Sequence, residues 1–269
     1  MEKQYLDGID VVYWINLDRA KDRKEHMEKN VINDDIFKDK EVIRLKAIDY
    51  KDKNLDKYLS INIHNRVSNK EYACLASHLE AIRTFSKTDH KNALIFEDDV
   101  SLDYKKYWTK TMQEIINGAP KDWGIIKLYI HPTRKMKSNY VLWKAKCIYS
   151  KDGEFQTIAD WGSIGYIINN KAAKKFVNQL YKNGKYHLPD NSFHVADYLI
   201  YDMIKTYAFK YPYFCTRKNN TTYIQTDDCK KKNRDHFAFM KYTQRKLKDR
   251  EKMLKQHKNK TMKNHKNEK

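Results

Sequence analysis

Glycine, proline and cysteine are all scarce in this chain. Its 269 residues include only 7 Gly and 4 Pro, which excludes a collagen-like or linker-like protein. The four cysteines (Cys74, Cys147, Cys215 and Cys229) form no Cys-x-x-Cys pair, so we expect reduced structural thiols rather than a zinc ribbon or a redox centre. Cys215, Cys229 and His236 lack a fourth ligand at finger-like spacing, which argues against a zinc site.

Long apolar runs are missing as well. No stretch reaches the roughly 20 apolar residues that a membrane-spanning helix needs, and the N-terminus lacks the basic and apolar regions of a signal peptide. We therefore expect a soluble, cytoplasmic protein that is at most peripheral at a membrane surface. Hydrophobic residues nevertheless make up 41% of the chain and aromatic residues 13%, which excludes wholesale disorder.

Positive charge is abundant and unevenly distributed, with a net charge of +19. Residues 230–269 contain 16 Lys or Arg and 4 Asp or Glu, a net +12, which leaves +7 for residues 1–229. We predict a globular domain over 1–229 and a basic tail over 230–269, where the heptad spacing of Met240, Leu247 and Leu254 indicates a helix with one thin docking stripe. Such a tail can contact nucleic acid, an anionic membrane or an acidic partner, but a solvated, solubilising face is the favoured interpretation.

Apolar strands alternate with amphipathic helices along the body. The run Val11–Ile15 is almost continuously apolar, as in a strand covered on both faces, and Ser68 with Glu71 forms a capping box before a helix. This alternation favours an α/β fold with a mostly parallel, doubly wound sheet. Strands are predicted near 10–17, 41–47, 93–96, 125–130, 141–149 and 163–168, and helices near 18–30, 68–85, 107–118, 171–181 and 195–205.

Three consecutive carboxylates, Glu97, Asp98 and Asp99, follow the buried strand near 93–96. Ligands of open α/β sheets bind outside the carboxyl ends of the strands. A divalent cation such as Mg²⁺ or Mn²⁺ would relieve the repulsion between three anions and keep coordination positions for phosphate oxygens. Because alternate residues share a face, Glu97 and Asp99 can act together while Asp98 turns away or caps the next helix. The alternative is a solvated turn with helix-capping acids.

Five short motifs carry a resemblance to a known family. They are Trp14–Arg19 with Arg23 and Met27, Ala47–Asp49, Ala73–His78, Leu94–Val100, and Gly162–Ile168 with Ala172. In order and spacing, across residues 11 to about 200, they resemble glycosyltransferase family 25, which contains bacterial lipooligosaccharide galactosyltransferases and collagen hydroxylysine galactosyltransferases. The resemblance implies a single Rossmann-like nucleotide-sugar-binding domain of the A-type transferase fold, a UDP-sugar donor, a divalent metal and inversion at the anomeric carbon.

The match is not complete. The first acidic position is Glu97, which this family uses although transferases at large have Asp there. Ser163 stands where Thr is commoner and keeps the hydroxyl, and Tyr50 stands where glycine is frequent, so the local loop is expected to differ. The tail beyond about Cys229 lies outside the resemblance.

The resemblance also implies roles for individual residues. Asp99 is the first choice as direct metal ligand, with Glu97 contacting the metal through water or the donor ribose. The candidate donor-binding residues are Asn16, Leu17, Arg19, Arg23, Asp49, His78, Glu97 and Asp98. Arginines after the first strand suit a diphosphate because they offer bidentate donors. Three alternatives stay open: Arg23 as a surface helix start, Asp49 as a plain loop acid and His78 as a core histidine.

Inverting transfer needs a general base, and Asp197 is the candidate. It lies in His194-Val195-Ala196-Asp197, with Asp190 shortly before it. The alternatives for Asp197 are a helix cap, a salt bridge, or a metal ligand together with His194, since residues i and i+3 share a helix face. Trp161 or Tyr166 can stack on sugar rings, although such residues more often fill a core.

The resemblance thus implies an inverting, metal-dependent transferase that moves a hexose, galactose or glucose, from a UDP-sugar to a hydroxyl of a glycan or protein acceptor. Because we see no signal peptide, we expect a role in glycan assembly, as in lipopolysaccharide biosynthesis, rather than collagen modification in the secretory lumen. Two rivals stay open. One is a degenerate transferase fold that binds nucleic acid or an anionic partner through its basic tail, and the other is a metal-dependent phosphohydrolase. Donor sugar, acceptor and oligomeric state are not fixed by the sequence, because sugar choice depends on side-chain placement.

Overall fold

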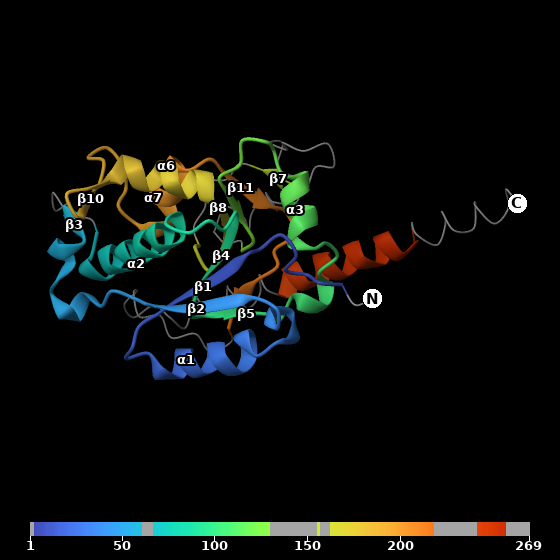
Figure 1. Cartoon of the computed structure of the whole chain (residues 1–269). Helices are drawn as coiled ribbons and strands as arrows, with labels where there is room; N and C mark the ends of the chain where they lie inside the picture. The colour runs from blue at the N-terminus through green and yellow to red at the C-terminus, as the bar shows by residue number, and fades with distance from the viewer. Residues whose placement is uncertain (1–2, 61–66, 130–154, 157–161, 218–240, 257–269) are drawn as a thin grey trace, which may run out of the picture.

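A seven-stranded sheet forms the centre of the computed structural model, which describes residues 3–60, 67–129, 155–156, 162–217 and 241–256 (Figure 1). The strand order is β2-β1-β4-β8-β6-β11-β7. Five strands run parallel, whereas β8 and β7 run antiparallel to their neighbours. The predicted α/β class with a mostly parallel sheet is therefore confirmed. The strands are β1 (Val11–Asn16), β2 (Glu41–Lys46), β4 (Asn92–Glu97), β6 (Ile125–Lys127), β7 (Phe155–Gln156), β8 (Gly165–Asn169) and β11 (Thr206–Phe209).

Helices cover both faces of the sheet (Figure 1). On one face lie α1 (Lys21–Met27) and α3 (Met112–Gly118), and on the other lie α2 (Asn69–Ser86), α6 (Asn170–Leu180) and α7 (Ala196–Met203). Every residue of β1 is buried, and its side chains alternate between the two cores, as its continuous apolar run predicts. The sheet is thus doubly wound.

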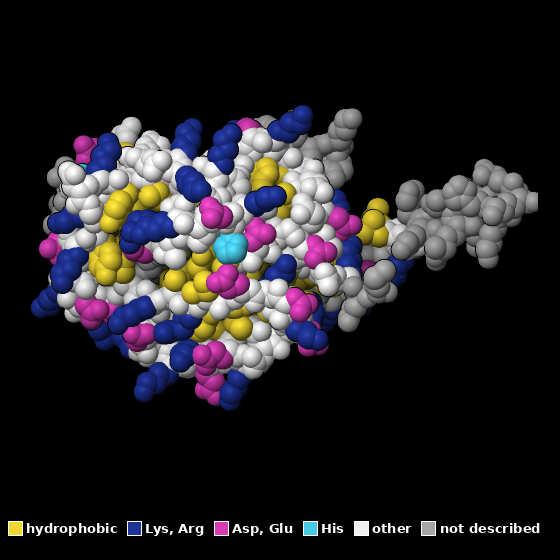
Figure 2. Space-filling model, in the orientation of Figure 1, with side chains coloured by type: hydrophobic (Ala, Val, Ile, Leu, Met, Phe, Trp, Pro, Cys, Tyr) yellow, Lys and Arg dark blue, Asp and Glu magenta, His cyan; other side chains and the backbone are white. Residues whose placement is uncertain are grey.

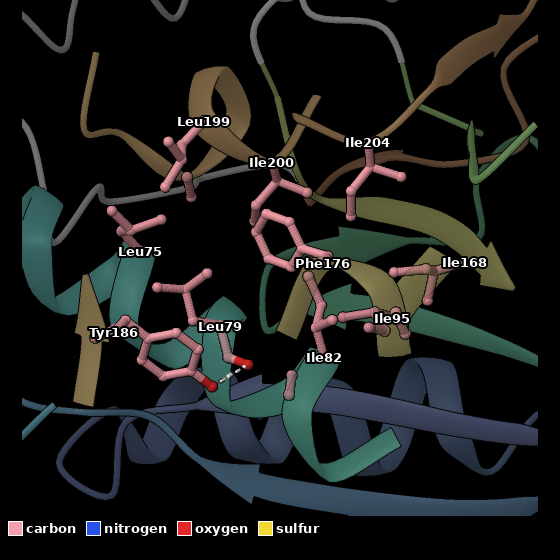
Figure 3. Close-up of a cluster of buried hydrophobic side chains, with 14 of the residues drawn as sticks. Leu75, Leu79, Ile82, Ile95, Ile168, Phe176, Tyr186, Leu199, Ile200 and Ile204 are labelled. Atoms are coloured by element: carbon pink, nitrogen blue, oxygen red, sulfur yellow. Dashed lines mark hydrogen bonds between the residues drawn. The ribbon is translucent and has the colours of Figure 1, made fainter. Parts of the chain in front are cut away.

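Apolar side chains of α2, α6 and α7 pack together in the core on one face of the sheet (Figure 3). Leu75 and Leu79 of α2 point toward Leu199 of α7, and the Tyr186 hydroxyl donates to the Leu79 carbonyl oxygen at 2.9 Å. The capping box at Ser68 is confirmed, because both of its reciprocal hydrogen bonds to Glu71 are present. The predicted helix is therefore correct at its start.

Two smaller sheets flank the central one. β3 (Leu59–Ser60), β10 (Lys185–His187) and β9 (Tyr181–Lys182) form one, and β5 (Val100–Ser101) pairs antiparallel with β12 (Cys215–Thr216) in the other. Neither was predicted, because their strands are two or three residues long. Short helical turns complete the chain at Glu28–Ile32, Asp35–Phe37, Tyr50–Asp52, Leu55–Lys57 and Lys105–Tyr107.

The C-terminal helix, residues 241–256, leaves the body as a projecting rod (Figure 1). Leu247 is buried at 3% exposure, as the docking stripe predicted, but Leu254 is 46% exposed and that part of the prediction is wrong. Leu254 follows Leu247 by two helical turns and lies on the projecting part, where the body no longer covers the helix. Met240 lies outside the described residues.

Two further expectations differ from the structure. The helix predicted over 107–118 begins only at Met112, and Tyr107 belongs to a separate short turn, because Thr111 caps the helix by accepting from the Glu114 backbone N–H. The strand predicted near 141–149 lies outside the described residues. Within the described part of the chain, no helix combines the length and apolarity needed to cross a bilayer.

Candidate functional site

The strand order reverses at β1, which has β2 on one side and β4 on the other. In open α/β sheets this reversal opens a ligand-binding crevice at the carboxyl ends of the strands. Asn16 is the last residue of β1 and Glu97 the last of β4, and Asp98 and Asp99 form the turn that leads into β5. The acidic cluster therefore lies at the topological switch point.

Asp98 points into the protein. Its Oδ2 accepts a hydrogen bond from Asn16 Nδ2 at 2.7 Å, and its Oδ1 accepts one from Arg23 Nη1 at 2.6 Å. Asp98 and Arg23 are 6% and 7% exposed. Strand β5 follows the acidic turn, so Asp98 caps no helix, and that alternative is wrong. Asp98 instead ties together the ends of β1, α1 and β4.

The same network extends to β2 through Arg44. The Nε and Nη2 atoms of Arg44 donate to Asn16 Oδ1 at 3.0 and 2.7 Å, and Nη2 also donates to Asp18 at 2.7 Å. Both ends of the Asn16 amide are thus engaged within the protein. Direct donor binding by Asn16 and Asp98 stays a prediction, and the structure gives both side chains a role in holding the site together.

Arg23 is the internal cation of the acidic turn. Burial lowers its pKa, but the charges of Asp99, Asp98 and Glu97 raise it by more, so the pKa lies above its ordinary value. Its Nη2 atom lies 3.7 Å from Asp99 Oδ2. The interpretation as a surface helix start is wrong, because the side chain is turned inward to neutralise carboxylates.

Glu97 faces the other side of the sheet. The Ser163 hydroxyl donates to its carboxylate, and His78 Nε2 lies 3.3 Å from Glu97 Oε1. Tyr166 supports His78, with its hydroxyl 3.1 Å from Nδ1. Burial raises the pKa of Glu97, but His78, Ser163 and the Arg23 charge lower it by more, so the pKa lies below its ordinary value.

The beginning of β8 reaches the site because this strand runs antiparallel. Its amino end lies at the same sheet edge as the carboxyl ends of β1 and β4, and the Glu97 backbone N–H donates to the Ile164 carbonyl oxygen at 3.0 Å. The predicted glycine motif, Gly162–Ile168, is thereby brought against the acidic turn.

Arg19 and Asp49 lie together at the rim. Arg19 Nε donates to Asp49 Oδ2 at 2.5 Å, and its guanidinium lies 5.9 Å from the centroid of the Tyr50 ring. Asp49 also caps the short helical turn that follows it by accepting from the Lys51 backbone N–H at 3.1 Å. Leu17 is partly buried against the core beside α2. At this rim, Arg19 and Asp49 are the charged side chains suited to exchange their mutual contact for contacts with a ligand.

Asp197 lies in the first turn of α7 and holds the glycine motif. Its Oδ2 accepts from the Gly162 backbone N–H at 2.6 Å, while the Tyr201 hydroxyl donates to the Gly162 carbonyl oxygen at 3.1 Å. Ser163 follows directly and bonds Glu97. Asp197 is therefore linked to the acidic turn through one short segment, and its role as a base stays a prediction.

His194 and Asp197 do not share a helical face. Helix α7 begins at Ala196, so His194 precedes it, and its Nε2 lies 2.8 Å from the Pro189 carbonyl oxygen. The i, i+3 spacing of a helix therefore does not bring these two residues together as metal ligands. Asp190 is exposed in the loop before them. Trp161 lies outside the described residues, as do Cys147, Cys229 and His236.

His78 and Tyr166 are buried at 1% and 0% exposure. This burial agrees with the interpretation of both as core residues. Their chain of contacts still ends on Glu97, so they orient a site carboxylate from within the core.

Glu97 and Asp99 are the carboxylates best suited to a cation. Among the described residues, no group of three or more His, Cys, Asp or Glu side chains is arranged to hold a metal ion. Mg²⁺ is commonly held by one or two carboxylates, with substrate phosphates and water completing its shell. Glu97 and Asp99 are enough carboxylates for such a site, and metal binding by them stays a prediction.

Arg44 and Arg217 belong to the site but were not predicted. Arg44 lies on β2, whose half-buried, mixed side chains give no clear pattern. Arg217 follows β12, and its backbone N–H donates to the Asp99 carbonyl oxygen at 2.8 Å. The apolar run Tyr213–Cys215 was the only signal in the sequence for a strand there.

A family model described as glycosyltransferase family 25 (LPS biosynthesis protein) matches residues 9–200. The chain belongs to glycosyltransferase family 25. The matched segment begins just before β1 and ends within α7, so it contains the acidic turn, Arg23, the glycine motif and Asp197. Family membership confirms the predicted resemblance and places the chain among glycosyltransferases.

Procollagen galactosyltransferase 2 of Homo sapiens is 26% identical over 183 residues, and the Mus musculus protein of the same name matches equally. These matches cover 63% of this chain and 28% of each relative. The chain thus spans little more than a quarter of the length of these curated relatives.

Among solved structures, A197 from STIV has a TM-score of 0.34 at 10% identity, covering 81% of this chain and 99% of that one. Galactosyltransferase LgtC in complex with donor and acceptor sugar analogues has a TM-score of 0.31 at 12% identity, covering 72% and 70%. Mouse xyloside xylosyltransferase 1 has a TM-score of 0.31 at 11% identity, covering 74% and 72%. These structural likenesses are distant.

Proposed function

We propose that this protein is an inverting, metal-dependent glycosyltransferase that moves a hexose from a UDP-sugar to a hydroxyl of a glycan or protein acceptor. The observation that carries the proposal is the acidic turn at the switch point of the sheet, inside the segment that matches family 25. Galactose is the favoured hexose because two curated relatives are named galactosyltransferases, and glucose is the alternative.

The chemistry requires charge stabilisation. Transfer from a nucleotide diphosphate releases a diphosphate and develops an oxocarbenium-like sugar, so preorganised electrostatics supply most of the rate. Asp99 and Glu97 would hold Mn²⁺ or Mg²⁺, which when bound neutralises charge on the departing diphosphate. Their geometry is set before any substrate arrives, because Ser163 fixes Glu97 and Arg23 lies beside Asp99.

Arg19 is the cation best placed to meet the donor. Its side chain is 29% exposed at the rim of the crevice, in contrast to the buried Arg23. A guanidinium binds phosphate oxygens in the same bidentate manner as a carboxylate, so Arg19 can release Asp49 and bind the diphosphate. Asp49 would then be available for the ribose.

Asp197 is the proposed general base. One of its oxygens accepts from Gly162, which fixes the carboxylate beside the glycine motif and leaves it partly exposed. A base must lie within hydrogen-bond reach of the acceptor hydroxyl as attack proceeds. A carboxylate anchored at one oxygen can meet that need with the other.

A panel of UDP-sugars tests the proposal, because many transferases slowly hydrolyse their own donor. We expect release of UDP from UDP-galactose or UDP-glucose in the presence of Mn²⁺, loss of this activity with a chelator, and thermal stabilisation by UDP with Mn²⁺. If no UDP-sugar is hydrolysed and UDP with Mn²⁺ does not raise the melting temperature, the proposal is wrong.

Nucleic-acid or anionic-partner binding through the tail is the second candidate. The helix over 241–256 carries 7 Lys or Arg and 2 Asp or Glu. On the body, Lys and Arg side chains are interspersed with acidic ones over the face shown in Figure 2. A salt-sensitive shift of oligonucleotide mobility without any UDP response would favour this candidate over the transferase.

A further inference from the structure

We propose that the C-terminal helix, residues 241–256, is a positioning element that fixes the acidic turn through the strand pair β5–β12. This helix lies beyond residues 9–200, the segment that matches the family. Only the activity readout of this proposal rests on the proposed function. The structural readout is independent of it.

The helix is docked by specific contacts. Leu247 is 3% exposed and packs in a cluster with Tyr104 and Cys215. One turn further on, the Arg250 guanidinium lies 3.4 Å from the centroid of the Tyr211 ring, a close cation–π contact. Most helical stability in proteins comes from packing against the rest of the chain rather than from intrinsic propensity. We therefore expect these contacts to hold the helix in place.

Cys215 transmits the docking to the strand pair. It belongs to β12, which pairs with β5 in the register Cys215 with Ser101 and Thr216 with Val100. Val100 is the residue directly after Asp99. Among the described strands, β12 is the partner of β5, so this pairing fixes the backbone that leaves the acidic turn.

The residue after β12 reaches both sides of the turn. The Arg217 backbone N–H donates to the Asp99 carbonyl oxygen at 2.8 Å, and its Nη2 donates to Asp22 Oδ2 at 2.6 Å. Asp22 lies on α1 next to Arg23, the cation of the turn. The segment under the helix thus holds the backbone of the proposed metal ligand and the helix that supplies its counter-charge.

Order at this point matters for the proposed metal binding. A ligand group that is already held in its bound geometry gives higher affinity than one that must first be ordered, because the cost of ordering is subtracted from the binding free energy. Contacts that hold β12 in place also lower the population of states in which β5 is detached from β12. Loosening the helix should therefore loosen residues 99–102 before the central sheet.

Leu247→Ala tests the proposal, with Leu254→Ala as its matched control. Both remove the same atoms from one helix, but Leu247 is 3% exposed and Leu254 is 46% exposed. In ligand-free and metal-free protein, we expect hydrogen exchange of amides 99–102 to be about tenfold faster in Leu247→Ala. Exchange in α2 should be unchanged in Leu247→Ala, and Leu254→Ala should behave as the original chain in both regions.

Activity provides a second reading. For Leu247→Ala, we expect the Mn²⁺ concentration at half-maximal UDP-sugar hydrolysis to rise about fivefold, with kcat at saturating Mn²⁺ close to the original value. A merely structural loss would lower the active fraction without moving the Mn²⁺ requirement. If the original chain hydrolyses no UDP-sugar, the proposed function fails, and hydrogen exchange alone decides the present proposal.

Unchanged exchange of residues 99–102 in a Leu247→Ala protein whose C-terminal helix has become unprotected would overturn the proposal. If Leu247→Ala instead exposes the whole chain to exchange, Arg250→Gln is the milder variant, because it removes the contact with Tyr211 and leaves Leu247 in place. The same two outcomes then apply to Arg250→Gln.

Discussion

The acidic turn and the C-terminal helix are both strongly charged, and they hold their charge in opposite ways. In the turn, Arg23 and Asp98 are 7% and 6% exposed and joined at 2.6 Å. In the helix, the Lys255 side chain is 74% exposed, and its contact with Glu251 at 2.7 Å is a surface pair. Most of the net charge of the chain lies in the tail, whereas the specific geometry lies in the turn.

This difference predicts how each region responds to mutation. Breaking a buried ion pair leaves an uncompensated charge away from water, whereas breaking a surface pair exposes that charge to solvent, which hydrates it. Charge count alone therefore indicates little about function. Burial and the number of partners per charge separate a built site from a solvated surface.

The largest effect is expected for Asp99→Ala. Loss of the proposed direct metal ligand should reduce Mn²⁺-dependent UDP-sugar hydrolysis by about 10³-fold, which corresponds to about 4 kcal/mol of transition-state stabilisation. The free energy of unfolding should change much less than in Arg23→Met, because Arg23 keeps its contact with Asp98 at 2.6 Å and one of three crowded carboxylates is removed. Exposed Asp89 provides the control Asp89→Asn. Full metal-dependent activity in Asp99→Ala would show that the ligand assignment is wrong.

Arg23→Met should cause the largest loss of stability. It removes the cation that neutralises the turn, and we expect the free energy of unfolding in urea to fall by about 3–5 kcal/mol. Arg23→Lys should restore part of this loss. Lys29→Met is the surface control, because Lys29 and Glu25 pair at 2.6 Å with side chains 68% and 62% exposed. Equal effects of Arg23→Met and Lys29→Met would remove the distinction between the two kinds of region.

Asp197→Asn separates catalysis from architecture. As a base, Asp197 should contribute about 10²-fold or more to kcat of transfer, while an amide oxygen can still accept from the Gly162 N–H and keep donor binding intact. Asp202→Asn, an exposed position on the same helix, is the control. Unchanged turnover in Asp197→Asn would show that Asp197 is not the base and that its role is the structural contact with Gly162.

The smallest effect is expected for Lys255→Ala. This exposed pair with Glu251 has i, i+4 spacing, which contributes about 0.3–0.5 kcal/mol to a helix. Thermal and urea unfolding should therefore be nearly unchanged, and UDP-sugar hydrolysis should be unaffected. A loss of more than about 1 kcal/mol in the free energy of unfolding would show that Lys255 makes a stabilising contact beyond its surface pair with Glu251.

Local signals in the sequence were sufficient for much of the fold. The capping box at Ser68, the continuous apolar run of β1 and the abrupt change from Phe96 to Glu97 each depend on neighbouring residues, and the structure confirms the elements that they predict. The same locality placed the acidic turn at a strand end. The order and spacing of the five motifs indicated the glycosyltransferase family, which the three consecutive carboxylates alone could not do.

Non-local contacts were out of reach for the same reason. The inward orientation of Asp98 depends on Asn16 and Arg23, which precede it by 82 and 75 residues. The pairing of β5 with β12 joins two-residue strands that have no periodic signal of their own. The exposure of Leu254 depends on where the body surface ends, which heptad spacing does not encode.

The reversed direction of β8 has a consequence for folding. Because this strand enters the sheet at the edge where β1 and β4 end, Ser163 meets Glu97 across 66 residues of chain, and the β1–β4 contacts span still longer separations. Contacts between such distant segments close large loops and so form slowly compared with helices and hairpins. On the ribosome, the acidic turn would emerge well before Ser163 and Arg217, which hold it from later segments of the chain. We therefore expect the ability to bind UDP with Mn²⁺ to be among the last properties that a refolding chain regains.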